Sequence, residues 1–193
     1  VLCKKIIFKL NLLHFSAKYL NVAITTILIK LLITKINKKG TINLLCISRP
    51  IFDEDIHAMA KQSNKINFII VPKEVFIIIF KIYLKEIISC HQEYHVLKGY
   101  DKDKALYNHF LKKIMIKLKK SLKIDAILSA NYNYTWQQEL AKVSKILNIS
   151  FIILFKEGIS PLYKKGELPN TGHIKLIKKF TNGIFIGDKL LVY

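Results

Sequence analysis

The chain has 193 residues and a formal net charge of +19, and 51% of its residues are hydrophobic, with only 4 Pro and 7 Gly. This composition excludes a disordered chain, and three widely spaced cysteines argue against a disulfide scaffold and favour a reducing compartment such as the cytoplasm. Arg49 is the only arginine among 32 basic residues, which disfavours a sequence-specific reader of nucleic acid, because such readers depend on arginine forks.

Residues 1–39 form a basic, apolar segment in which we expect one or two helices. The segment carries lysines and no acid, and the first acidic residue of the chain is Asp53. None of its apolar stretches reaches the roughly 20 residues that a membrane span needs. Two interpretations stay open: the segment packs on the domain that follows, or it lies on an anionic membrane surface.

Residues 40–193 alternate between short apolar runs and helical patterns. The runs are nearly continuous and β-branched, as in parallel strands that are covered on both faces. We expect strands at 42–47, 66–71, 124–129, 149–155 and 184–187, with a further one at 190–193, and helices at 53–62, 73–90, 102–122 and 134–147. The sequence therefore predicts an α/β fold: a Rossmann-like parallel sheet flanked by helices, preceded by the basic helical segment 1–39.

The loop after the first predicted strand offers three candidate site residues. Ligands of an open parallel sheet bind beyond the carboxyl ends of its strands, so these loops are where chemistry is expected. Arg49 has a forked guanidinium that suits phosphate, and Asp53 and His57 are candidate catalytic groups in the helix that follows. The alternative is that the acids of this loop only stabilise the first turn of that helix.

The loop after the third predicted strand concentrates amides and aromatic rings. Flat rings beside amides suit a sugar, whose apolar face stacks while its hydroxyls need hydrogen-bond partners, and they would also suit stacked bases. The candidate binding residues are Asn131, Tyr132, Tyr134 and Trp136. In the alternative interpretation, Thr135 or Asn133 caps the next helix and Trp136 packs inward.

The loop after the fourth predicted strand places Glu157 directly after a buried run. A carboxylate at this position can be partly desolvated, which suits it to act as a general base. Gly158 lets the backbone turn or approach a ligand closely. The alternative is an ordinary loop carboxylate paired with Lys156.

We expect no metal site and no bound cofactor. The stretch from Cys90 to His95 has two histidines four residues apart, but its glutamate occupies the wrong position for a zinc-protease motif. The sequence contains neither a Gly-x-Gly-x-x-Gly motif nor a Walker-type loop. A nicotinamide-binding domain and a P-loop NTPase are therefore disfavoured.

Three stretches resemble the N-terminal half of the GT-B-type glycosyltransferases of bacterial capsule and surface-polysaccharide biosynthesis. They are TINLLCISRPIFDEDIH, KIDAILSANYNYTWQQELAKVSKILNISFIILFKEGISP and TNGIFIGDKLLVY. The resemblance implies two facing Rossmann-like domains, of which this one binds the acceptor and a second one binds the nucleotide-sugar donor. It also implies that Glu157, or else Asp53 or His57, deprotonates the acceptor hydroxyl, and that the aromatic loop lines the acceptor side.

The expected function is the acceptor-binding domain of a glycosyltransferase that moves a sugar from a nucleotide-sugar to a surface-polysaccharide or lipid-linked acceptor. We expect the chain to be part of a larger enzyme and to be inactive alone. The expected location is the cytoplasm, and an alternative is peripheral association with the inner membrane face through residues 1–39. A glycerophosphotransferase of wall-polymer synthesis would share this architecture. A non-enzymatic basic domain that binds nucleic acid or a membrane surface is the alternative from another class.

Overall fold

The computed structural model describes residues 2–19, 21–37, 39–84, 99–130, 134–155 and 188–192. In chain order its elements are α1 (Leu2–Lys18), α2 (Val22–Leu32), β1 (Thr34–Ile36), β2 (Ile42–Ser48), α3 (Pro50–Gln62), β3 (Ile66–Pro72), α4 (Lys73–Tyr83), α5 (Asp101–Leu122), β4 (Ala126–Ser129), α6 (Thr135–Ile146), β5 (Ser150–Phe155) and β6 (Lys189–Val192).

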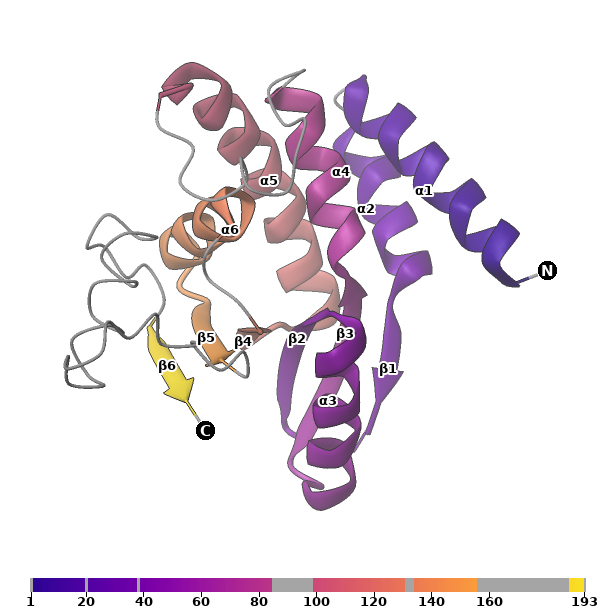
Figure 1. The fold of residues 1–193 in the computed structure, drawn as a ribbon, viewed down its shortest axis with the longest axis vertical. Coiled ribbons are helices and arrows are strands. Elements are labelled where there is room, and N and C mark those ends of the chain that lie inside the picture. Colours follow the sequence, from indigo (N-terminus) through magenta and orange to yellow (C-terminus); the bar gives the residue numbers. More distant parts are fainter. Residues whose placement is uncertain are drawn as a thin grey trace, which may run out of the picture.

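The strands form one six-stranded sheet in the order β1-β3-β2-β4-β5-β6 (Figure 1). Neighbouring strands from β3 to β6 are parallel, and β1 pairs antiparallel with β3 at the edge. The predicted α/β fold with a largely parallel, helix-flanked sheet is therefore confirmed. Strands β2, β3, β4 and β5 lie where the apolar runs predicted them, and β6 overlaps the run at 190–193, whereas 184–187 lies outside the described residues.

Two elements differ from the sequence expectation. Helix α4 ends at Tyr83, where Leu84 leaves the helical conformation, and the rest of the predicted helix 73–90 lies outside the described residues. Strand β1 was not expected at all, because it has only three residues and two of them are exposed. It extends the sheet by pairing with β3, and the Asn37 amide after it donates to the carbonyl oxygens of Ala60 and Ser63.

Alternate side chains of the strands enter two cores on opposite faces of the sheet. In β2, Leu45 and Ile47 belong to the core formed with α1, α2, α4, α5 and α6, whereas Leu44 and Cys46 belong to the core formed with α3. Figure 1 shows this division as a helical layer above the sheet and a separate α3. The two-sided burial explains why the strand sequences are nearly continuously apolar.

The N-terminal helices pack on the rest of the domain. Leu13 and Ala17 of α1 and Leu28 and Ile29 of α2 are buried in the larger core. A buried hydrogen bond between the hydroxyls of Ser16 and Thr25, with 3.0 Å between the oxygens, joins the two helices. The described part of residues 1–39 therefore shares one core with the sheet. In the part of the chain that the structure describes, no helix is long and apolar enough to cross a membrane.

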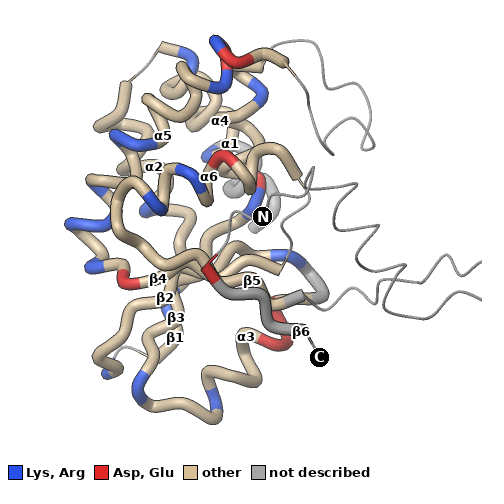
Figure 2. The backbone as a smooth tube through the Cα atoms, turned by 90° about the vertical axis from the view of Figure 1, so that its left-hand side faces the viewer, with Lys and Arg blue, Asp and Glu red and all other residues tan. Residues whose placement is uncertain are grey.

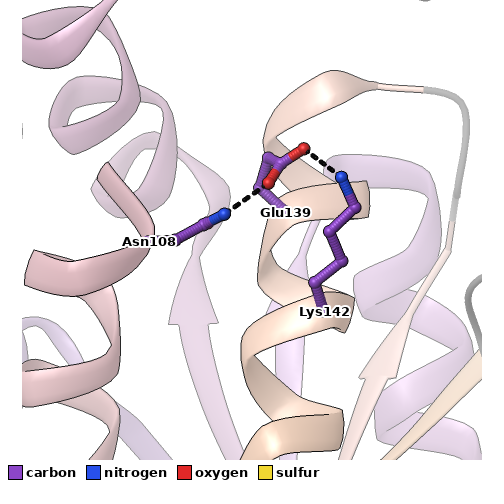
Figure 3. Close-up of polar contacts among 3 residues, drawn as sticks. All are labelled: Asn108, Glu139 and Lys142. Carbon is purple, nitrogen blue, oxygen red and sulfur yellow. Dashed lines mark hydrogen bonds and ion pairs between the residues drawn. The ribbon is translucent and has the colours of Figure 1, made fainter. Parts of the chain in front are cut away.

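A buried carboxylate joins α5 to α6 (Figure 3). Glu139 is 2% exposed, and its two oxygens accept hydrogen bonds from Asn108 Nδ2 at 2.5 Å and from Lys142 Nζ at 2.7 Å. Tyr107 is fully buried in the same layer, and its hydroxyl has no hydrogen-bond partner. Burial, and secondarily the Glu139 charge, raise the pKa of Tyr107 well above its ordinary value. This layer is thus held by polar contacts as well as by apolar packing.

Candidate functional site

The order of the strands places the candidate site between β2 and β4. In the sheet, β3 is the neighbour of β2 on one side and β4 is its neighbour on the other side. The helix after β2, α3, covers one face of the sheet, whereas the helix after β4, α6, covers the opposite face. Such a reversal of strand order opens a crevice at the carboxyl ends of the two strands, where α/β sheets bind ligands. The loops that follow Ser48 and Ser129 therefore define the candidate site.

The β2 side of the site contains a hydroxyl and a carboxylate in direct contact. Ser48 Oγ donates a hydrogen bond to Asp53 Oδ2 at 2.8 Å. Asp53 lies in the first turn of α3, whose start is fixed by Pro50, and the positive end of the helix dipole stabilises its charge. The other carboxylate oxygen, Asp53 Oδ1, is buried and has no hydrogen-bond partner. The carboxylate is therefore oriented by one oxygen and has unused acceptor capacity on the other.

A buried thiol, Cys46, lies near this carboxylate. Cys46 lies in β2 and is completely buried. Burial, and then the neighbouring Asp53 charge, raise the pKa of the Cys46 thiol well above its ordinary value. Because the thiolate is the reactive form, burial in the core and the raised pKa both disfavour Cys46 as a nucleophile.

The β4 side of the site contributes an aromatic ring that meets the β2 loop. Tyr134, at the start of α6, is half-buried, and the guanidinium carbon of Arg49 lies 5.8 Å from the centre of its ring. This distance is within the range of a cation–π contact. Arg49 itself precedes α3 with an extended backbone, φ −143° and ψ 143°. Two loops far apart in the sequence are thus brought together at one point of the sheet edge.

A buried amide supports the β4 end from within. Gln137 Nε2 donates to Ser129 Oγ at 2.8 Å, and Gln137 is only 1% exposed. Its carbonyl oxygen is buried and has no hydrogen-bond partner. Neither these two residues nor Ser48 was among the predicted site residues. The sequence pattern that could have pointed to Ser48 and Ser129 is a polar residue at the last position of an apolar strand. For Gln137 it is a polar residue within the apolar stripe of the helix that follows.

Trp136 lies behind the site and does not line it. It is 3% exposed and belongs to the larger core. Its ring stacks on Phe76 of α4 with 6.1 Å between centres, and on Tyr134 with 6.5 Å between centres. This position corresponds to the inward-packing alternative. The indole therefore fixes the position of Tyr134 and leaves little surface for a ligand.

The remaining candidates divide into one placed residue and four that are not described. His57 is exposed on α3, one turn beyond Asp53. Asn131, Tyr132, Glu157 and Gly158 lie outside the described residues. Within the described ranges, no group of three or more histidine, cysteine or acidic side chains could hold a metal ion. The groups that the structure brings together are therefore a guanidinium, a carboxylate, a hydroxyl and an aromatic ring.

Comparison with known proteins gives no relative for this chain: no protein-family model, curated protein or solved structure matches it.

Proposed function

We propose that this chain is the acceptor-binding domain of a GT-B-type glycosyltransferase, which transfers a sugar from a nucleotide-sugar to a surface-polysaccharide or lipid-linked acceptor. The observation that carries the proposal is the contact of Arg49 with the ring of Tyr134 at the switch point of the sheet, on whose β2 side Ser48 also holds Asp53. Both loops also carry the side chains for which the sequence predicts a ligand site. Their side chains match the needs of a sugar: a ring for its apolar face and charged groups for its hydroxyls.

Asp53 is the described residue best suited to receive the acceptor hydroxyl. Its Oδ2 is held by Ser48, while its Oδ1 has no partner. Because Oδ1 is buried, the Asp53 side chain would turn toward the site for an acceptor hydroxyl to donate to it. The carboxylate would then take the hydroxyl proton as the hydroxyl oxygen attacks the anomeric carbon of the donor, and the bond from that carbon to the phosphate oxygen of the nucleotide would break. Arg49 would then bind a neighbouring hydroxyl or an anionic group of the acceptor, while Tyr134 stacks on its ring.

The test is acceptor binding by the chain itself. An array of oligosaccharides from bacterial capsules and surface polysaccharides should show selective binding to a subset of them. Asp53→Asn and Arg49→Lys should each weaken the binding of those sugars by about tenfold or more, since a hydrogen bond to a charged group contributes about 1.5–3 kcal/mol. The matched control is Glu54→Gln, which removes an exposed charge from the same turn of α3 and should leave binding unchanged.

A deoxy sugar makes the test specific for the acceptor hydroxyl. The wild-type chain should bind the deoxy analogue, which lacks the accepting hydroxyl, about tenfold more weakly than the parent sugar. The Asp53→Asn variant should bind the analogue and the parent sugar equally well, because the substitution and the deoxy sugar remove the same contact. A chain that binds no sugar on the array, or one whose Asp53→Asn and Arg49→Lys variants bind as the wild type does, would contradict the proposal.

A further inference from the structure

The outer face of α1 and α2 exposes large apolar side chains. They are Leu12, Phe15 and Tyr19 on α1 and Ile24, Ile27 and Leu31 on α2, with exposed fractions from 40% to 64%. In each helix the three residues follow the spacing i, i+3, i+7, so they form one stripe along the helix. We call the two stripes together the apolar face. Exposed apolar patches of this kind mark interaction surfaces.

The apolar face is preformed and rigid. The opposite sides of both helices are buried in the core through Leu13 and Ile29, and the Ser16–Thr25 hydrogen bond fixes one helix against the other. Lys9 Nζ adds a second link by donating to the Leu31 carbonyl oxygen at 3.0 Å. Because the helices already use their inner sides for folding, the stripes remain for a partner outside this part of the chain.

The helices α1 and α2 carry lysines and no acidic residue. The chain has no acidic residue before Asp53, and Lys18, Lys30 and Lys35 are exposed. Figure 2 marks the basic positions along the backbone in blue. An open depression of about 410 Å³ at the end of α2 is lined by Lys30, Ile33, Lys35 and Leu122. Such a depression has the charge and the size to receive an anionic headgroup beside the apolar face.

This combination selects one partner among three. A second copy of the chain would bring two positive faces together, which charge repulsion opposes. A nucleic acid would use the lysines and the rings of Phe15 and Tyr19 but not the four aliphatic side chains, since single strands bind by stacking on aromatic rings. An anionic lipid surface uses both, because apolar side chains enter the boundary of the acyl chains while lysines contact the headgroups. We propose that the α1–α2 face docks this protein on an anionic membrane surface, independently of the proposed function.

Vesicle co-sedimentation tests this docking. The full chain should bind vesicles of equal parts phosphatidylglycerol and phosphatidylcholine, bind phosphatidylcholine alone much more weakly, and lose binding at high salt. Replacing Phe15, Ile27 and Leu31 together by Gln should weaken binding by about tenfold or more. In the matched control variant, Gln replaces three apolar residues that are exposed on α5 and α6: Leu106, Ile116 and Ile146. This control variant should bind vesicles as the wild type does.

A second variant keeps the apolar face and changes only the charge. Lys18→Gln, Lys30→Gln and Lys35→Gln together should also weaken binding by more than about tenfold, since each lysine near an anionic surface strengthens binding about fivefold. Circular dichroism should show that both triple variants are folded. Binding that ignores lipid charge, or that survives both triple variants, would overturn the proposal. So would an absence of vesicle binding together with a dimer that the apolar-face variant dissociates.

Discussion

Removing the carboxylate that joins α5 to α6 should destabilise the protein mainly through Asn108. Glu139 is 2% exposed, so its contact with Asn108 Nδ2 at 2.5 Å is shielded from water. A hydrogen bond to a charged acceptor contributes about 1.5–3 kcal/mol. Asn108 Oδ1 already lacks a partner, so Glu139→Ala leaves the whole amide of Asn108 unpaired. The side chain of Lys142, by contrast, is 49% exposed and returns its ammonium to water, and its pair contributes less than about 1 kcal/mol.

Two double-mutant cycles, measured by urea denaturation at neutral pH, separate these contributions. The cycle of Asn108→Ala with Glu139→Ala should give a coupling of about 1.5–3 kcal/mol. The cycle of Lys142→Ala with Glu139→Ala should give less than about 1 kcal/mol. Equal couplings in the two cycles, or an Asn108–Glu139 coupling below about 0.5 kcal/mol, would refute this reasoning about burial.

Three further predictions concern other parts of the fold. Tyr107→Phe should not lower stability at neutral pH, because it removes a hydroxyl without a partner. Above pH 10.0, the ordinary pKa of tyrosine, the unfolded chain ionises at Tyr107, while the raised pKa keeps this residue protonated in the folded state. The wild-type chain therefore loses up to about 1.4 kcal/mol of stability per pH unit through Tyr107, and Tyr107→Phe should abolish this loss. An unchanged alkaline slope in thermal unfolding would contradict this assignment. Gly40→Ala should lower the free energy of unfolding, measured by urea denaturation, by about 1–3 kcal/mol, because the added Cβ would lie 2.6 Å from the Lys65 carbonyl oxygen. An unchanged free energy of unfolding would show that the backbone at this junction can move. Cys46 should resist iodoacetamide at neutral pH in the native chain and react after unfolding, as read by peptide mass spectrometry, whereas equal rates in the two states would argue against its burial.

The strands could be predicted because burial on both faces produces continuous apolar runs. The runs in β2 and β5 are of this kind. Strand β1 could not be found in this way, because an edge strand of three residues with two exposed side chains carries no such pattern. It depends on pairing with β3, a contact between residues that are far apart in the sequence.

The candidate site was predictable as a set of loops but not as a geometry. Strand ends reveal which loops face the ligand edge, and this selected both Arg49 and Tyr134. The order of the strands, which makes β2 and β4 neighbours, does not follow from local patterns. The orientation of Trp136 does not follow either, because an aromatic residue after a strand end fits an open site and a buried core equally well. Its contact with Phe76 decided between them.

The most direct test of the account is to locate where an acceptor sugar binds. An NMR titration of the ¹⁵N-labelled chain with an oligosaccharide selected on the array should shift the resonances of Ser48, Arg49, Asp53 and Tyr134, which lie at the carboxyl edge of β2 and β4. The backbone amide of Asn43, which donates to Asp125 Oδ2 at the opposite edge of the same strands, should remain unchanged. Shifts confined to the Asn43–Asp125 edge or to α1 and α2 would contradict a sugar site at the switch point.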